Sequence, residues 1–327
     1  MNTQAAPVTE LRVERDGPVL ILSLDGPNSR NSISPPVYKA IQSEIITAGQ
    51  DPEVRAIVLT GLHGFFSSGG NINNLKESAK STLAVVSGNT DALNAMILAI
   101  RNCPTPVIAA VEGGAAGAGM SLALACDMIV AAEGAKFVVA YVKVGLAPDG
   151  GVTHFLSEGL PRQIVSEMCL TGNPVEAERL HALGLVNLVV PAGEAIAAAK
   201  GMAAKLAAGA VGAMAVIKFE IAAAPHNDLA TQLVVEAHGI NTARFGAEAA
   251  EGLAAFLEKR KPDFAGKPVH RVQGERSALG NTFGACDRSR GRHRCQLQRP
   301  GHFFGAVVHA GMGHIGQRRA PFLCRKL

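Results

Sequence analysis

Short apolar runs and segments with helical spacing alternate along the first part of the chain. Residues 9–17 and 18–26 carry strand-like patterns, and a turn at Asp16 and Gly17 separates them, so two strands are predicted. Residues 34–50 begin with a serine and two prolines and then repeat apolar positions at helical spacing, which predicts a helix.

Three further apolar runs predict strands of a sheet. The runs at 54–61 and 106–114 are continuous and end in glycine, as is typical of buried strands in a mostly parallel sheet. Residues 91–103 between them have helical spacing, which gives a strand–helix–strand order. Residues 126–137 predict another strand.

The pattern changes after about residue 150, where strands become scarce. Three alanine-rich stretches, at 193–209, 210–224 and 229–261, predict helices. We therefore expect an α/β core over residues 1–195 and a C-terminal helical region over residues 196–267, which would serve oligomerisation.

The last sixty residues, 268–327, differ from the rest in composition. They carry 11 Lys and Arg against 2 Asp and Glu, whereas residues 1–267 carry 20 against 25, so the formal net charge of +4 arises in this tail. A basic nucleic-acid arm, or a metal site of Cys286, His293, Cys295 and His302, would be functional interpretations. The cysteine and histidine spacing matches no common zinc pattern. We interpret the tail as a disordered, non-homologous extension and expect no nucleic-acid partner.

Composition also bears on the compartment. No apolar run reaches the roughly 18 residues that span a bilayer, and the N-terminus shows no basic region followed by an apolar core. The six cysteines have no regular spacing, which favours free thiols in a reducing compartment. We therefore expect a cytoplasmic protein with no membrane partner.

A glycine- and alanine-rich stretch at 109–127 interrupts this pattern between a predicted strand and a predicted helix. Small residues at such a corner leave backbone N–H groups accessible to a ligand. A dinucleotide-binding turn is one alternative, but the glycines at 113, 114, 117 and 119 do not fit G-x-G-x-x-G. Tight helix–sheet packing is another.

Several segments together resemble the crotonase (enoyl-CoA hydratase/isomerase) superfamily. They are SLDGPNSRNSIS, GFFSSGGNINNL, PVIAAVEGGAAGAGMSLALACDMIVAAEGAKF, VGLAPDGGVTHFL and LTGNPVEAERLHALGLVNLVVP. The similarity covers roughly residues 8–267 in family order. It implies an α/β spiral of β-β-α units with a C-terminal helical region, a role in fatty-acid metabolism such as β-oxidation, and a homotrimer or homohexamer.

The resemblance also gives the glycine- and alanine-rich stretch at 109–127 a role. Enzymes of this family bind an acyl-CoA thioester and stabilise an enolate on its oxygen with two backbone N–H groups. By position these are the amides of Ser68 and Ala118, and Ala118 would lie where a loop becomes a helix. The family pattern further places substrate contacts at 30–32, 67–72, 117–121 and 141. The residues are Arg30, Asn31, Ser32, Ser67, Gly69, Gly70, Asn71, Ile72, Gly117, Ser121 and Tyr141.

The proton-transferring residue separates the possible reactions. Hydratases of the family use two glutamates, and the matching positions hold Ser121 and Tyr141. Asp149 remains, at a position where some isomerases that look like this sequence carry a proton-shuttling aspartate. One carboxylate suffices to move a proton from the alpha to the gamma carbon. A helix-capping role for Asp149 is the competing interpretation.

These expectations favour enoyl-CoA double-bond isomerisation with Asp149 as the proton carrier. An enoyl-CoA hydratase, or a non-catalytic acyl-CoA-binding homologue, are the alternatives. CoA would arrive as part of the substrate, with no separate cofactor and no metal. Glu112, within the glycine- and alanine-rich stretch, is interpreted as a residue that faces solvent or braces a loop.

Overall fold

In the part of the chain that the structure describes, nine strands form two sheets that position the glycine-rich corner. The computed structural model describes residues 9–78 and 80–267, which lie in the unit Met1–Gln273; the predicted 268–327 tail lies outside the described residues. The larger sheet has the order β1-β2-β3-β4-β6-β9 and the smaller one the order β5-β7-β8. The strands are β1 (Glu10–Asp16), β2 (Val19–Asp25), β3 (Ala56–Gly61), β4 (Val107–Val111), β5 (Gly114–Ala116), β6 (Met128–Ala132), β7 (Lys136–Val138), β8 (Val175–Glu176) and β9 (Leu188–Val190).

The strand pairing follows the apolar pattern of the sequence. β1 and β2 form the predicted antiparallel hairpin, with Asp16 opposite Val19 across the turn. In the rest of the large sheet the pairs are parallel: β2 with β3, β3 with β4, β4 with β6, and β6 with β9. Every residue of β3 and β4 is buried. Strands covered on both faces need no polar alternation, which explains their continuous apolar runs.

One predicted strand proves to be two. Residues 126–137 divide into β6 in the large sheet and β7 in the small sheet, so the prediction of a single strand was wrong. A turn at Gly134, whose φ is +70°, separates them. Twice along the chain, a strand of the large sheet is followed by a strand of the small sheet and then by a helix: β4 and β5 precede α4, and β6 and β7 precede η1 and α5. This order confirms the β-β-α spiral.

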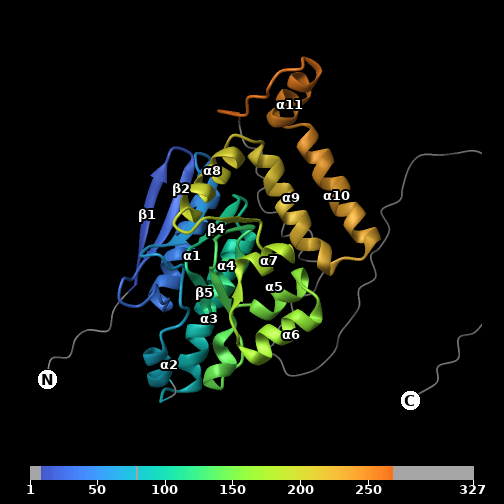
Figure 1. Ribbon diagram of the computed structural model, residues 1–327. Helices are drawn as coiled ribbons and strands as arrows, with labels where there is room; N and C mark the ends of the chain where they lie inside the picture. The colour runs from blue at the N-terminus through green and yellow to red at the C-terminus, as the bar shows by residue number, and fades with distance from the viewer. Residues whose placement is uncertain (1–8, 79, 268–327) are drawn as a thin grey trace, which may run out of the picture. The chain divides into compact units, whose positions relative to one another are not determined.

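The helices surround this spiral, and Figure 1 shows their arrangement. They are α1 (Pro35–Gln50), α2 (Ile72–Ser78), α3 (Leu83–Asn102), α4 (Ala118–Ala125), α5 (Val152–Gly159), α6 (Arg162–Thr171), α7 (Ala177–Ala182), α8 (Ala195–Ala207), α9 (Val211–Ala223), α10 (Leu229–Arg244) and α11 (Ala247–Leu257), with 3₁₀ helices η1 (Ala140–Val144) and η2 (Ala224–His226). α9 and α10 lie side by side, in contact, beyond α8.

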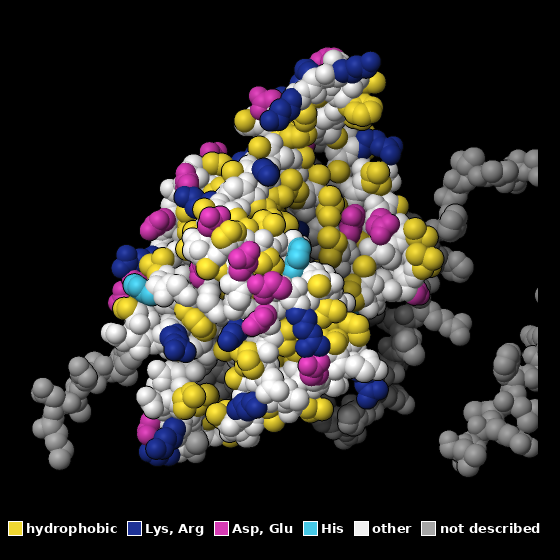
Figure 2. All heavy atoms as spheres, viewed as in Figure 1, with side chains coloured by type: hydrophobic (Ala, Val, Ile, Leu, Met, Phe, Trp, Pro, Cys, Tyr) yellow, Lys and Arg dark blue, Asp and Glu magenta, His cyan; other side chains and the backbone are white. Residues whose placement is uncertain are grey.

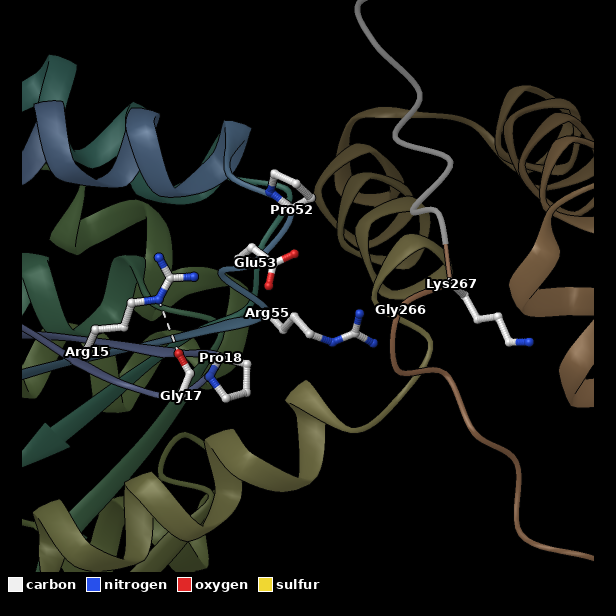
Figure 3. A pocket seen from close by; sticks show the side chains of 8 residues that line it. All are labelled: Arg15, Gly17, Pro18, Pro52, Glu53, Arg55, Gly266 and Lys267. Atoms are coloured by element: carbon white, nitrogen blue, oxygen red, sulfur yellow. Dashed lines mark hydrogen bonds between the residues drawn. The ribbon is translucent and has the colours of Figure 1, made fainter.

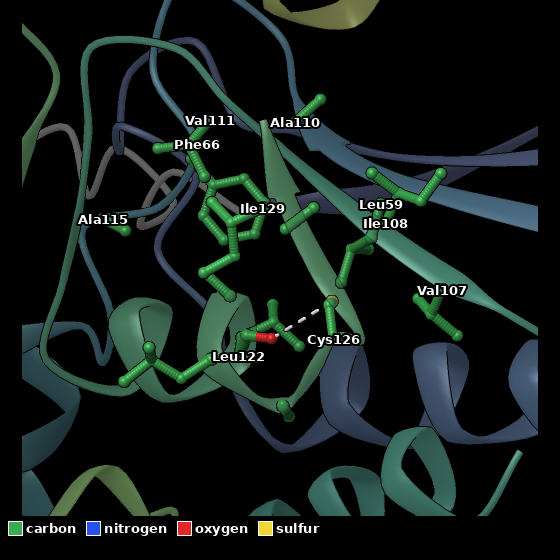
Figure 4. Close-up of a cluster of buried hydrophobic side chains, with 14 of the residues drawn as sticks. Leu59, Phe66, Val107, Ile108, Ala110, Val111, Ala115, Leu122, Cys126 and Ile129 are labelled. Atoms are coloured by element: carbon green, nitrogen blue, oxygen red, sulfur yellow. Dashed lines mark hydrogen bonds between the residues drawn. The ribbon is translucent and has the colours of Figure 1, made fainter. Parts of the chain in front are cut away.

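Small side chains let α8 approach the large sheet closely. Its buried positions are Ala195, Ala199, Ala203 and Ala207, spaced four apart, so one alanine stripe faces β2, β3, β4 and β6. Figure 4 shows the core beneath the glycine-rich corner, where Phe66 and Ile129 lie among side chains of β4 and α4. This core fixes the strand ends that carry the site.

Helix α3 is long and apolar enough to cross a membrane by length and composition alone. Its best 18-residue window has a mean hydropathy of 1.4. Polar residues such as Asn89, Asp91 and Asn94 interrupt the helix, so it is not a continuous apolar run of the length considered in the sequence analysis. Its second half nevertheless buries Leu93, Met96, Ile97 and Ile100, and it packs against α1. The bent pair α8 and α9 also passes the test if counted as one span, with an angle of 108°.

Candidate active site

The corner between β5 and α4 presents a backbone amide at a helix start. Helix α4 begins at Ala118, as predicted, and Gly117 precedes it with φ +51°. Within residues 9–78 and 80–267, the Ala118 amide donates no hydrogen bond. An unpaired N–H at a helix N-terminus, where the helix dipole is positive, is suited to an anionic oxygen.

The loop that follows β3 packs directly against this corner. A Cβ added at Gly69 would lie 2.5 Å from the Ala116 carbonyl oxygen and 3.0 Å from the Ala118 nitrogen. A Cβ at Gly119 would lie 2.6 Å from the Ser67 carbonyl oxygen. Only glycine permits this approach, so the two predicted oxyanion segments are in contact.

The Ser68 amide, however, does not face the corner as a free donor. It donates to the Arg30 carbonyl at 2.9 Å, and the Ser68 hydroxyl donates to the Ser29 carbonyl at 3.0 Å. The prediction that Ser68 supplies an oxyanion hydrogen was therefore wrong for this structure. The reason is that a bond between two loops already uses that hydrogen.

The next peptide along this loop is differently placed. Gly69, with φ +83°, turns the chain beside Ala118, and the Gly70 amide that follows donates no hydrogen bond in the part of the chain that the structure describes. Of the two amides, Gly70 rather than Ser68 is therefore available beside Ala118.

Several predicted substrate contacts prove to brace these loops. Asn31 is fully buried, its amide group donates to the carbonyls of Leu62 and Phe65, and its side-chain oxygen accepts from the Gly26 amide. The Ser67 hydroxyl is also buried and donates to the Asn31 carbonyl at 2.8 Å. These side chains hold the loop rather than present themselves to a ligand.

The remaining predicted contacts differ in exposure. Ser32 is buried, and the Arg30 guanidinium lies over the Phe65 ring, 5.8 Å from its centroid. The Asn71 side-chain oxygen accepts from the Asn73 amide at the start of α2. Ile72 is 65% exposed, beside the loop.

Two side chains from the segment between β7 and α5 meet at the corner. The Tyr141 hydroxyl donates to Asp149 Oδ1 at 2.7 Å. A Cβ added at Gly117 would lie 3.9 Å from that hydroxyl oxygen. Tyr141 therefore links the Asp149 carboxylate to the residue that precedes Ala118.

Burial and the carboxylate together keep the Tyr141 phenol protonated. Desolvation is the largest cause that raises the pKa of Tyr141 far above its usual range, and the negative charge of Asp149 raises it further. The phenol is thus a hydrogen-bond donor at any physiological pH. The competing interpretation of Asp149 as a helix cap is not observed, because α5 is preceded by Gly151 and has no side-chain cap.

Ser121 occupies the position of a family glutamate and braces the same segment. Its hydroxyl donates to the backbone carbonyl of Asp149 at 3.0 Å, and Ser121 is fully buried. A Cβ added at Gly150 would lie 2.9 Å from the Ser121 Cβ. A side chain the size of glutamate would collide with this backbone.

The sequence reasoning missed Tyr38, in the first turn of α1. Tyr38 is buried, and its pKa rises to about 12, first because of desolvation and then because of the Asp149 charge. The chain has only two tyrosines, and the charge of Asp149 raises the pKa of both. The small number of tyrosines was the feature of the sequence that could have pointed to Tyr38.

Of the two roles that the sequence suggested for Glu112, facing solvent is wrong and bracing a loop is observed. Its carboxylate is buried and accepts the amides of Gly193 and Ala195, at 3.0 Å and 2.8 Å. These amides lie at the start of α8. Glu112 therefore ties β4 to α8.

Two cavities lie away from these residues. One of about 780 Å³ is lined by the β1–β2 turn, Arg55 and Lys267, and Figure 3 shows it. There Arg55 donates to the carbonyls of Ala207 and Gly209. Another, of about 530 Å³, lies among α9, α10 and α11. Neither is lined by Ala118 or Asp149.

One group of side chains can hold a metal ion. His154 and Glu158 on α5 and His226 in η2 place ligand atoms within 4.8 Å of one another, and all three are exposed. Among the described residues, no comparable group of possible metal ligands lies at the oxyanion corner.

A corner with free backbone amides beside the Asp149 carboxylate is suited to a thioester enolate. Comparisons with known proteins give the family. The enoyl-CoA hydratase/isomerase family matches residues 14–267. The chain belongs to this family, within the crotonase superfamily. It is an enzyme, a lyase or isomerase that acts on acyl-CoA.

The relatives of this chain include proteins named as hydratases and proteins named as isomerases. The chain is 32% identical to 2,3-dehydroadipyl-CoA hydratase of Escherichia coli, over 80% of this chain and 100% of that one. It is 33% identical to 1,2-epoxyphenylacetyl-CoA isomerase of the same organism, over 76% and 95%. The crystal structure of an enoyl-CoA hydratase from Polaromonas sp. JS666 matches with 43% identity and a TM-score of 0.76, over 77% and 98%.

Proposed function

We propose that this enzyme moves the double bond of an enoyl-CoA thioester, with Asp149 as the proton carrier. One observation carries the proposal. The Asp149 carboxylate, hydrogen-bonded to Tyr141, lies at the side of the corner where Gly117 precedes the free Ala118 amide. A base is thus near a site for the negative charge that forms when it acts.

The reaction then needs two proton transfers. Asp149 removes a proton from the alpha carbon of a 3-enoyl thioester, and the electron pair moves onto the thioester oxygen. The Ala118 and Gly70 amides stabilise this oxyanion. The protonated Asp149 returns the proton at the gamma carbon, where the electron pair of the old beta–gamma double bond forms the new C–H bond. The carbon–carbon electron pair of the enolate becomes the alpha–beta double bond, the oxyanion pair re-forms the carbonyl, and the carboxylate is regenerated.

The two former glutamate positions argue against efficient hydration. Water addition requires groups that hold the water and exchange protons with it. The Ser121 hydroxyl is engaged with the Asp149 carbonyl, and the raised pKa of Tyr141 keeps its phenol protonated. Asp149 is therefore the one carboxylate that we assign to this corner.

Hydration is the second candidate function, because the Polaromonas structure, at 43% identity, is described as an enoyl-CoA hydratase. A non-catalytic acyl-CoA-binding homologue would show neither reaction. The decisive assay offers the protein crotonyl-CoA and, separately, a 3-enoyl-CoA of the same chain length or two carbons longer. We expect isomerisation to exceed hydration by at least about 100-fold in kcat/KM. Faster water addition would refute the proposal.

We further propose that CoA enters with the substrate, without a separate cofactor, and that the reaction serves fatty-acid β-oxidation. A cytoplasmic location is supported by free thiols at Cys103, Cys126 and Cys169. A calorimetric titration with free CoA, and cell fractionation, test these points. Binding with no added ion or nucleotide is expected.

We also propose assembly into a homotrimer or a pair of trimers through the C-terminal helices. Large apolar side chains are exposed along α9 and α10, and Figure 2 shows hydrophobic surface over these helices. They include Ile217, Phe219, Ile221, Leu233, Val234 and Ile240. Such a surface is typical of a protein interface. Light scattering of the purified protein is expected to give three or six chains, and a monomer would contradict this.

A further inference from the structure

The geometry points to Tyr141 as a positioning residue that orients the Asp149 carboxylate, a role distinct from the substrate contact that the sequence suggested. This inference rests on the proposed function. The Tyr141 hydroxyl donates to Oδ1 at 2.7 Å, and a neutral phenol can only donate to a carboxylate. Oδ2 is thereby assigned as the oxygen that exchanges the substrate proton.

Three features of the structure constrain Asp149. The Tyr141 phenol holds Oδ1, the Ser121 hydroxyl holds the backbone carbonyl, and Gly150 turns the following chain with φ +61°. A carboxylate fixed at both its backbone and one oxygen has little rotational freedom left. The second oxygen can then be presented to substrate without an ordering step.

The position of the phenol also couples the base to the oxyanion corner. Its oxygen would lie 3.9 Å from a Cβ at Gly117, the residue before the Ala118 amide. Tyr141 lies in η1, whereas Asp149 follows it by eight residues and Gly117 belongs to another turn of the spiral. One side chain thus sets the relative placement of base and amide.

The other tyrosine provides a matched control. Tyr38 is buried near the same charge, but its hydroxyl donates to the Ile33 carbonyl at 3.4 Å rather than to Asp149. The charge of Asp149 raises the pKa of both Tyr38 and Tyr141. Removing one hydroxyl at a time separates a direct hydrogen bond from a general change of polarity.

The experiment measures kcat and KM of isomerisation for Tyr141→Phe and Tyr38→Phe. Tyr141→Phe is expected to lower kcat about 10- to 100-fold with KM within about threefold, because a hydrogen bond to a charged group is lost. Tyr38→Phe is expected to keep kcat and KM close to the wild-type values.

Two results would overturn the inference. Unchanged kcat and KM in Tyr141→Phe would do so, as would a rise in KM with kcat unchanged, which marks a substrate contact. Asp149→Asn, measured in parallel, separates the levels of the argument. If Asp149→Asn is inactive and Tyr141→Phe has the kinetics of the wild type, the proposed function is kept and only the positioning role of Tyr141 is rejected. An active Asp149→Asn would remove the proposed function itself.

A different observation carries a second inference: we propose a surface site for Zn²⁺ formed by His154, Glu158 and His226. His154 and Glu158 lie one helical turn apart on α5, with Nε2 and Oε1 3.2 Å apart. The His226 ring, from η2, stacks on the His154 ring with centroids 6.0 Å apart and planes 9° from parallel. Two imidazoles and a carboxylate are ligands that zinc prefers.

Such an ion would join elements that lie far apart in sequence. α5 follows the Asp149 segment, and η2 connects α9 to α10. The ligand atoms already lie within 4.8 Å, so modest side-chain rotations bring them to one ion. Zinc would then fasten the C-terminal helices to the helix that follows the proposed base.

The test counts zinc bound by the full-length chain after chelator treatment and desalting. Because the 268–327 tail also contains histidines and cysteines, the readout is a difference between variants. His226→Asn is expected to bind one equivalent fewer than the wild type and to lose most of the zinc-induced rise in melting temperature. His63→Asn, whose imidazole pairs with Asp25 alone at 2.6 Å, should match the wild type. Equal counts in all three proteins would refute the site.

Discussion

A methyl group at Gly69 tests the contact between the two oxyanion segments. In Gly69→Ala the new Cβ would lie 2.5 Å from the Ala116 carbonyl oxygen and 3.0 Å from the Ala118 nitrogen. Both neighbours are backbone atoms, so the loop and the corner must move apart. The residue also has φ +83°, which disfavours any side chain.

The two costs can be estimated separately. Left-handed backbone costs a non-glycine residue about 1–2 kcal/mol, and the overpacking adds about 1–3 kcal/mol of destabilisation. Displacing one oxyanion donor costs about 3 kcal/mol in the barrier, which corresponds to roughly 100-fold in kcat. We therefore expect a folded but less stable enzyme with kcat about 100-fold lower.

Gly64→Ala is the matched control. Gly64 has φ +71°, and a Cβ there meets nothing within 4 Å. This variant carries the backbone strain without the collision, so it is expected to lose only about 1–2 kcal/mol of unfolding free energy and to keep its kcat. Urea unfolding and steady-state kinetics measure both quantities. If Gly69→Ala kept kcat within threefold of Gly64→Ala, the assigned corner would be refuted.

Two further predictions concern stability. The pKa of Tyr38 rises from 10.0 to about 12 on folding, so its contribution to the free energy of unfolding is complete below pH 10 and is lost as pH rises toward 12. Between pH 9.5 and 11.5, Tyr38→Phe should therefore lose about 2 kcal/mol less unfolding free energy than the wild type. If urea unfolding showed the same pH dependence for both proteins, this prediction would be contradicted. Glu112→Gln turns an amide donor toward the Gly193 and Ala195 amides; it should cost about 2–4 kcal/mol in urea unfolding at unchanged kcat, and an unchanged midpoint would show that this brace is unimportant.

Apolar patterning predicted most strands and the helical C-terminal region, because burial on both sheet faces requires continuous apolar runs. It failed where two strands follow one another closely. The run at 126–137 looks uniform, yet a turn at Gly134 sends its halves into different sheets. Partner choice between sheets is a tertiary property that one segment does not encode.

The candidate site was predicted in part. Ala118 begins its helix as expected, and Asp149 lies at the same corner. The choice of Ser68 failed because position in a motif does not reveal which amide a neighbouring loop has already taken; here the Arg30 carbonyl accepts it. Tyr38 was missed because its distance from Asp149 in sequence hides their proximity in the fold.

The central claim is that one carboxylate carries the proton, and Asp149→Asn tests it most directly. The substitution keeps the shape of the side chain while removing its ability to accept a proton. The measurement is kcat for conversion of a 3-enoyl-CoA to the 2-enoyl product, with KM as the check on binding. The account predicts a loss of about 10²- to 10⁴-fold in kcat at nearly unchanged KM. A variant that isomerises within tenfold of the wild-type rate would contradict it.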